Sequence, residues 1–259
     1  MINPRSGQGP DAVELSEEAK RLGVETHLLE TGEDPGEVAR AAPEGVVGMA
    51  GGDGSLAAVA EVAIERDVPL VVVPFGTRNH FARDVGLDRD DPVAALAAFT
   101  GGREQLVDVG RVNGRLFLNN VSLGIYARLV HRRELHRRRR DAFARLRALG
   151  ILLRRPGGLG VTVDGRPVEA RVVLVANNHY ELDLFSVGER ERLDEGLLNV
   201  YVAAGLLPTA WEERSGGRFV IDAAAGRMRA AVDGEPENLA TPLRFEIEPA
   251  ALRLLLPQG

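Results

Sequence analysis

An apolar run meets a glycine-rich turn in the stretch Met49-Ala50-Gly51-Gly52-Asp53-Gly54-Ser55-Leu56, and an amphipathic helical pattern follows over residues 55–65. Where a strand leads into a helix through such a turn, backbone N–H groups and the positive end of the helix dipole converge on one point. Glycine permits positive φ and lets phosphate oxygens approach the backbone. The stretch therefore predicts an anion site between a strand and a helix, although a purely structural turn fits the same residues.

The first hundred residues alternate short apolar runs with amphipathic ones, which is typical of a parallel sheet covered by helices. The predicted strands are residues 24–29, 45–49 and 69–74, and the predicted helices are residues 11–22, 35–42 and 55–65. The chain begins almost at Asn3-Pro4, where a preceding strand is expected. We therefore expect the first strand to be truncated.

From about Gln105 the pattern changes to short β-like runs separated by turn residues. Asn113-Gly114 and Asp164-Gly165 are strong signals for hairpin turns, so we expect an antiparallel sandwich. The predicted strands of this region are residues 107–112, 115–119, 160–163, 171–176, 197–203, 229–232, 243–247 and 252–256. We expect two domains, an α/β domain at 1–105 and a β-rich domain at 106–259 with a helical insertion at about 127–153.

The composition is that of an ordinary soluble globular protein, with 44% hydrophobic and 27% charged residues. The absence of cysteine excludes disulfides, thiolate zinc sites and cysteine nucleophiles. The sequence has neither a secretion signal nor an apolar run of the roughly 20 residues that a membrane-spanning helix needs. These features together predict a cytoplasmic protein.

Further segments accompany the glycine-rich turn in a fixed order. They are Asn3-Pro4-Arg5-Ser6-Gly7, Thr31, Pro74-Phe75-Gly76-Thr77-Arg78-Asn79-His80-Phe81-Ala82-Arg83, Phe117-Leu118-Asn119-Asn120 with Gly124, Arg192-Leu193-Asp194-Glu195-Gly196-Leu197, and Asp233-Gly234-Glu235. The ordered set covers nearly the whole chain and resembles the diacylglycerol kinase and sphingosine kinase family of lipid kinases. The turn alone is weakly specific, since phosphofructokinases and NAD kinases look similar there.

The resemblance implies a Rossmann-like parallel α/β nucleotide domain, followed by an antiparallel β-sandwich domain that handles the lipid substrate. It implies ATP as the phosphate donor, diacylglycerol or a related long-chain lipid as the acceptor, and Mg²⁺ as the accompanying ion. The residues that the resemblance assigns to the nucleotide are Asn3, Ser6, Gly7, Thr31, Gly51, Gly52, Gly54, Ser55, Thr77 and Asn79.

By resemblance, Glu235 is the first choice and Asp233 the second for the general base that takes the proton of the lipid hydroxyl. Asp53, beside the glycines of the turn, can hold Mg²⁺ directly or through water. Phosphoryl transfer needs mainly positioning and charge neutralisation, so one carboxylate near the acceptor hydroxyl and one near the magnesium are sufficient. From the residues alone, Asp233-Gly234-Glu235 also fits a plain hairpin turn.

A structural Mg²⁺ site is also implied, with the backbone oxygens of Arg192 and Leu197 and the carboxylate of Glu195 as ligands. A solvated turn is the alternative. Two residues depart from the family pattern: Glu195 stands where aspartate is usual, and His80 stands where many relatives have aspartate. These departures leave open a catalytically silent homologue that binds nucleotide or lipid, and an NAD kinase-like enzyme is a further alternative.

Between Arg128 and Arg155 the chain has 11 arginines against two acids, a local charge of +9 in a chain of net charge −6. Leucines and Phe143 are spaced there as an apolar stripe, which suits a helix at an anionic membrane surface. A solvated basic helix is the alternative. Aromatic residues for base stacking are nearly absent, so we expect no nucleic acid partner. We expect peripheral membrane association, and a homodimer stays open.

Overall fold

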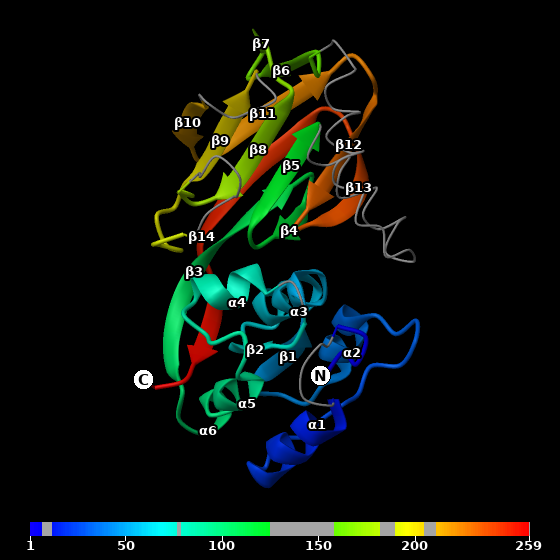
Figure 1. Cartoon of the computed structure of the whole chain (residues 1–259), viewed down its shortest axis with the longest axis vertical. Helices are drawn as coiled ribbons and strands as arrows, with labels where there is room; N and C mark the ends of the chain where they lie inside the picture. Colours follow the sequence, from blue (N-terminus) through cyan, green and yellow to red (C-terminus); the bar gives the residue numbers. More distant parts are fainter. Residues whose placement is uncertain (7–11, 77–78, 125–157, 182–189, 205–210, 259) are drawn as a thin grey trace. The chain divides into compact units, whose positions relative to one another are not determined.

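The computed structural model describes residues 1–6, 12–76, 79–124, 158–181, 190–204 and 211–258, which Figure 1 draws as coloured ribbons. The chain divides into two compact units: unit 1 comprises Met1–Val109 and Pro249–Gly259, and unit 2 comprises Gly110–Glu248. Residues 249–259 thus belong to unit 1, whereas the sequence-based division assigned them to the second domain. Strands β3 (Arg103–Val112) and β14 (Leu243–Leu256) each run from one unit into the other.

The central strands of unit 1 are parallel. Strand β1 (Val47–Gly51) pairs with β2 (Leu70–Pro74), and Leu254 of β14 pairs in parallel with Leu70 of β2. On the other side of β1, Ile2 forms parallel bridges to Ala50 and to Leu28. The strand predicted at residues 24–29 is thereby reduced to a single bridge, and Ile2 takes the place of the expected first strand.

Six helices of unit 1 lie within the described residues: α1 (Ala12–Arg21), α2 (Pro35–Ala41), α3 (Asp53–Glu65), α4 (His80–Asp84), α5 (Pro92–Ala95) and α6 (Ala98–Gly101). Helix α3 buries Leu56, Val59, Ala60 and Ala63, which are spaced on one helical face, so it packs on the sheet through that face. Asp34 caps α2 by accepting hydrogen bonds from two backbone amides. The helices predicted before and after β1 are confirmed, with small shifts at their ends.

The strands of unit 2 are antiparallel and form two sheets. One is six-stranded in the order β10-β9-β8-β5-β12-β13, and the other contains β11, β6, β7 and the unit 2 parts of β14 and β3, with β4. The strand bounds are β4 (Arg115–Phe117), β5 (Asn120–Gly124), β6 (Val161–Val163), β7 (Arg166–Val168), β8 (Val172–Asn177), β9 (Leu198–Ala203), β10 (Glu212–Gly216), β11 (Arg218–Ala223), β12 (Arg227–Val232) and β13 (Glu235–Ala240).

One apolar core receives side chains from both sheets of unit 2. Val173 and Val175 of β8 enter this core together with Phe117 of β4 and Phe245 of β14, whose rings meet edge to face at 6.4 Å. Leu174 and Ala176, which alternate with the two valines, lie on the opposite face of the same strand. The predicted fold class, an α/β domain followed by an antiparallel sandwich, is confirmed. The predicted insertion at 127–153 lies outside the described residues.

Candidate functional site

The glycine-rich turn of unit 1 joins β1 to α3. Gly51 is the last residue of β1, and Gly52 is the residue before the first turn of α3, where it has no side chain to cap the helix amides. The first amides of a helix have no partner within the helix, so a turn of this kind offers them to an anion. The helix begins at Asp53 rather than at the predicted Ser55.

Small size, and not positive φ, explains the glycine at position 51. None of Gly51, Gly52 and Gly54 has positive φ, which corrects our expectation for this turn. A Cβ on Gly51 would lie 2.7 Å from the methyl group of Met49 and 3.3 Å from the Cβ of Ser55. A larger residue would therefore push Ser55 away from the turn.

The opening loop of the chain is joined to this turn by Asn3. The Nδ2 group of Asn3 donates to the Oγ of Ser55 at 3.0 Å, and its Oδ1 accepts from the amide of Arg5 at 3.1 Å. Asn3 itself is buried, and its backbone amide donates to the carbonyl of Ala50. Two predicted nucleotide residues, Asn3 and Ser55, are thus brought into direct contact by the sheet.

Asp53 connects the turn to the loop that follows β2. Its carboxylate accepts from the backbone amides of His80 and Phe81, at 3.2 and 3.3 Å, and so caps the start of α4. Asp53 is 3% exposed. We expected Asp53 to face a metal ion; the structure adds a second task, because the same carboxylate holds the neighbouring loop in place.

The loop after β2 also contacts the opening loop. Gly76 has a φ of +154°, and a Cβ there would lie 2.9 Å from the backbone oxygen of Ser6. The buried Asn79 donates from Nδ2 to the carbonyl of Gly76, while its Oδ1 has no hydrogen-bond partner among the described residues. A buried amide oxygen without a partner costs about 1–3 kcal/mol, so a bound donor at this position would be favourable.

Three of the predicted nucleotide residues are not among the described contacts of these loops. Thr31 lies in an exposed turn shortly after Leu29, whose amide bonds to Ile2. Gly7 and Thr77 lie outside the described residues. The remaining predicted residues of unit 1 belong to three loops that meet at the start of α3.

In unit 2, Asp233 anchors the hairpin turn that precedes β13. Its two carboxylate oxygens accept from the backbone amides of Leu118, Asn119 and Asn120, at 2.8, 2.8 and 3.1 Å. The side chain is 7% exposed, and Asp233 and Gly234 both have positive φ, as a tight two-residue hairpin requires. These contacts identify a structural function for Asp233.

Glu235 lies directly after this turn as the first residue of β13, opposite Val232 of β12. It is half-buried. Because Asp233 fixes the turn on the segment 118–120, the backbone position of Glu235 is fixed by the same contacts. Of the two predicted bases, Glu235 is the more exposed.

The turn at residues 192–197 provides oxygen ligands of the type that Mg²⁺ prefers. The Glu195 carboxylate accepts from the amide of His179 at 2.8 Å, and the Leu197 carbonyl accepts from the amide of Asn178 at 2.9 Å. The Arg192 side chain pairs with Asp194 at 3.0 Å. Among the described residues, no group of three or more histidine, cysteine, aspartate or glutamate side chains is arranged to hold a metal ion.

Tyr201 lies near this turn and stays protonated. Burial raises the pKa of its hydroxyl, and the Glu213 and Glu195 carboxylates raise it further. Its oxygen accepts from the amide of Tyr180 at 3.0 Å. Tyr201 was not among the predicted site residues, since an alternating strand pattern shows only that such a side chain is buried on one face.

Arg190 is a further residue that the sequence did not single out. It is 3% exposed, and its guanidinium donates to the carbonyls of Leu118 and Asn177 and to the Oδ1 of Asn119. In the sequence it is one of many arginines, and its partners lie far away along the chain. Its burial could therefore not be predicted.

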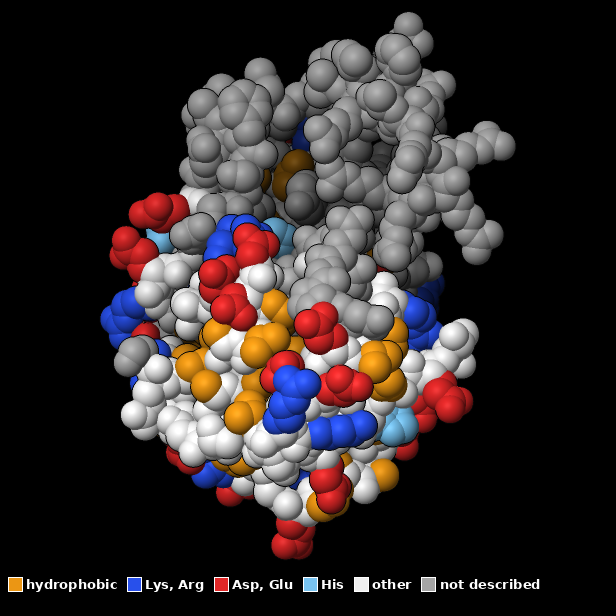
Figure 2. Space-filling view, turned by 60° about the horizontal axis from the view of Figure 1, so that its bottom comes forward, with side chains coloured by type: hydrophobic (Ala, Val, Ile, Leu, Met, Phe, Trp, Pro, Cys, Tyr) orange, Lys and Arg blue, Asp and Glu red, His pale blue; other side chains and the backbone are white. Residues whose placement is uncertain are grey.

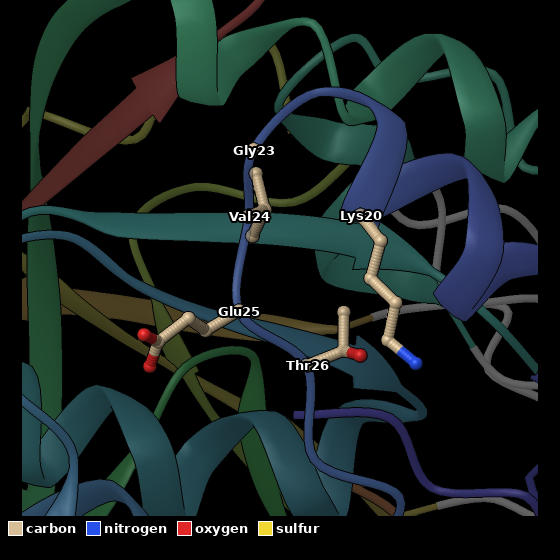
Figure 3. Close-up of a pocket in the computed structure, with 5 residues that line it drawn as sticks. All are labelled: Lys20, Gly23, Val24, Glu25 and Thr26. Carbon is tan, nitrogen blue, oxygen red and sulfur yellow. The ribbon is translucent and has the colours of Figure 1, made fainter.

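A shallow hollow of unit 1 is lined by Lys20, Gly23, Val24, Glu25 and Thr26 (Figure 3). In the close-up, the Lys20 amine and the Thr26 hydroxyl lie on one side, and Glu25 points to the other. Acidic, basic and hydrophobic side chains are interspersed on the described part of the face in Figure 2. The hollow contains none of the predicted site residues, and one cation with one hydroxyl does not make a phosphate site.

The sequence model that describes the diacylglycerol kinase catalytic domain matches residues 1–112, which include the glycine-rich turn and all three loops at the start of α3. The first 112 residues belong to the diacylglycerol kinase catalytic-domain family. This confirms the family resemblance drawn from the ordered motifs.

Two relatives show sequence similarity to this chain, and the first of them covers most of it. A Pseudomonas aeruginosa protein named "Probable lipid kinase YegS-like" is 29% identical over 242 residues, which cover 81% of this chain and 76% of the relative. A Bacillus subtilis protein named "Diacylglycerol kinase" is 34% identical over 84 residues, 32% of this chain and 28% of that protein.

The fold is shared with a solved structure. The crystal structure of a diacylglycerol kinase from Bacillus anthracis superposes with a TM-score of 0.70 at 20% identity, and covers 98% of this chain and 94% of that one. This likeness extends the common fold through unit 2, beyond the catalytic-domain match.

No helix among the described residues is long and apolar enough to span a bilayer. The predicted basic segment between Arg128 and Arg155 lies outside those residues.

Proposed function

We propose that the protein is an ATP-dependent lipid kinase that phosphorylates the hydroxyl of diacylglycerol or of a related long-chain lipid. One observation carries the proposal: three loops of unit 1 meet at the start of α3. Asn3 bonds to Ser55, Gly76 packs against Ser6, and Asp53 caps α4. Membership in a family of lipid kinases supports this reading of the loops.

The chain's own groups suit a phosphate chain at this point. Gly52 provides no side chain to cap α3, and the positive end of the helix dipole favours an anion there. The Ser55 hydroxyl, held by Asn3, adds a polar group beside them. The partnerless Oδ1 of Asn79 offers an acceptor for a hydroxyl or amino group of the nucleotide.

Two sets of oxygen ligands fit Mg²⁺. Asp53 would hold an ion whose other ligands are phosphate oxygens and water, and Glu195 with the backbone oxygens of Arg192 and Leu197 would hold a structural one. When bound, the first ion neutralises charge on the phosphate oxygens. Neither set needs a closed cage of protein side chains, which agrees with the described residues.

Glu235 is the proposed general base for the acceptor hydroxyl. Asp233 accepts three backbone amides, and protonating it would weaken all three bonds. Glu235 lies one turn residue further along and is more exposed. In the proposed reaction the Glu235 carboxylate takes the proton of the lipid hydroxyl as its oxygen bonds to the γ-phosphorus, and the bond from that phosphorus to the β,γ-bridging oxygen breaks, so that ADP leaves.

The test is a transfer assay with γ-labelled ATP, Mg²⁺ and mixed micelles that contain diacylglycerol, monoacylglycerol, phosphatidylglycerol, ceramide and a long-chain base. We expect label in one lipid class, and a fall in kcat of about 10²–10⁴-fold in Glu235→Gln, the range that general-base catalysis supplies. Glu246→Gln on β14, which is exposed, is the matched control and should be fully active.

Other outcomes select the alternatives. ATP binding without label in any lipid would indicate a catalytically silent homologue that binds nucleotide. This is the main alternative, because His80 and Glu195 depart from the family pattern. Label in NAD, in a parallel reaction that contains NAD in place of the micelles, would indicate an NAD kinase-like enzyme. Full activity of Glu235→Gln would remove Glu235 as the base.

A further inference from the structure

Among the described residues, Arg190 is the one arginine or lysine that lies buried. Its Nη1 donates to the carbonyls of Leu118 and Asn177 at 2.8 and 3.1 Å, and its Nη2 donates to the Oδ1 of Asn119 at 2.8 Å. The guanidinium also lies 5.1 Å from the centre of the Tyr180 ring. The planar fork of arginine suits several acceptors at fixed directions, so this side chain faces inward and is held on several sides.

Asp233 holds the same segment from its amide side. The amides of Leu118, Asn119 and Asn120 donate to the Asp233 carboxylate, while the Leu118 carbonyl and the Asn119 side chain accept from Arg190. Asn177 adds a bond from its Nδ2 to the carbonyl of Leu118. The buried Arg190 guanidinium and the buried Asp233 carboxylate therefore bind residues 118–120 from opposite sides.

Residues 118–120 connect three motifs that are far apart in the sequence. Residues 117–120 form one motif, Arg190 lies two residues before the turn at 192–197, and Asp233 begins the third motif, which ends at Glu235. The amide of Asp233 also donates to the carbonyl of Asn120, which adds a bond in the reverse direction. Movement of Leu118 or Asn119 would thus be passed to the hairpin that carries Glu235.

We propose that Arg190 is a positioning residue: it fixes residues 118–120 against Asp233 and thereby sets the place of Glu235. The expected effect on kcat rests on the proposed kinase function, whereas the hydrogen bonds from Arg190 to residues 118–119 do not depend on it. Charged hydrogen bonds are stronger than neutral ones and act here in a buried environment, which suits a rigid support.

The test compares Arg190→Met and Arg190→Lys with Arg218→Met, a control at an exposed side chain of β11. Amide hydrogen exchange of Leu118, Asn119 and Asn120 is measured by NMR in each. We expect exchange about tenfold to a hundredfold faster in Arg190→Met, the range for losing hydrogen bonds to a charged group. Arg190→Lys keeps a cation without the fork, so it should rescue part of the protection.

The kinetic readout is the separation of kcat from KM. We expect Arg190→Met to lower kcat while the KM for ATP, whose proposed site lies in unit 1, stays unchanged, with partial recovery in Arg190→Lys. Exchange equal to that of the Arg218→Met control would overturn the proposal, as would an unchanged kcat in an active enzyme.

Two additional cases are covered, a variant that does not fold and a wild-type protein without lipid kinase activity. If Arg190→Met does not fold, Asn119→Ala removes a single acceptor of the same group, and faster exchange at Leu118 and Asn120 is expected. If the wild-type protein phosphorylates no lipid, the proposed function fails, yet the exchange data still decide whether Arg190 holds the backbone.

Discussion

Two buried aspartates illustrate how single side chains organise the candidate site. Asp53 accepts two backbone amides at the start of α4, and Asp233 accepts three in the segment 118–120. In the sequence, both lie beside glycines and look like chemical groups of a site. The structure shows that each also holds a loop, so substitution of either one tests folding and function together.

Asp53 is best tested against a capping aspartate away from the site. Asp53→Asn keeps one acceptor oxygen and loses the charge, so we expect a loss of about 1–3 kcal/mol in the free energy of unfolding. Because the carboxylate is proposed to face Mg²⁺, the affinity for Mg²⁺-ATP should fall more than the stability explains. Calorimetric titration and chemical denaturation measure the two effects.

Asp34→Asn is the control, because Asp34 also accepts two backbone amides, those of Gly36 and Glu37, at the start of α2. We expect a comparable change in stability and an unchanged affinity for ATP. Equal ATP affinities in wild type and Asp53→Asn would show that Asp53 acts only as a cap.

At the scale of elements, two hairpin turns were predicted correctly from two-residue sequences that readily adopt positive φ. Asn113-Gly114 and Asp164-Gly165 each join two paired strands, and all four residues have positive φ. The strand at 24–29 was not formed as predicted, because its apolar pattern says nothing about whether a neighbouring strand is long enough to pair with it. Within the described residues, Ile2 forms the single bridge to this run, at Leu28.

The turn before Glu235 offers a prediction with a matched partner elsewhere in unit 2. Gly234 has a φ of +79° and Gly165 has a φ of +76°, each after an aspartate with positive φ. Alanine at either position should destabilise by about 1 kcal/mol or more, because a Cβ is strained at positive φ. We expect Gly234→Ala also to lower kcat, since it displaces Glu235, and Gly165→Ala to leave kcat unchanged.

Thermal denaturation and the lipid kinase assay provide both readouts. A similar loss of stability in the two variants, with equal and unchanged kcat, would mean that the turn does not determine the position of the reacting group.

At the scale of the whole molecule, charge is unevenly distributed along the chain. The segment between Arg128 and Arg155 carries +9 in a chain of net −6, which leaves −15 for the rest. We propose that this segment attaches the protein to anionic lipid, where a lipid substrate would be reached. The acidic remainder would be repelled by the same surface, which would favour one orientation.

Sedimentation with liposomes tests this attachment. We expect more protein to sediment with liposomes containing phosphatidylglycerol than with neutral ones at low salt, and the difference to shrink as salt screens the charges. A variant with glutamine at Arg137, Arg138, Arg139 and Arg140 should lose most of the difference. Equal sedimentation with both lipids would contradict the proposal.

The sequence predicted the order of elements well and the tertiary contacts poorly. The strand–turn–helix unit around Gly51 depends on neighbours in the chain, so its pattern was readable. Arg190 and Leu118 are bonded across 72 positions, and Asp233 and Leu118 across 115. Such contacts depend on the register of several strands, which no local pattern specifies. The candidate base could be predicted, but its supporting contacts could not.

The passage of β14 from unit 2 into unit 1 has a consequence for biosynthesis. Residues 1–109 are synthesised before unit 2, but the part of β14 that pairs with β2 through Leu254 belongs to residues 249–259, which are synthesised after unit 2. The unit that contains the proposed nucleotide loops therefore cannot complete its sheet until the other unit has been synthesised. In a nascent chain, the proposed nucleotide loops would therefore gain the support of the complete sheet only after unit 2 has been synthesised.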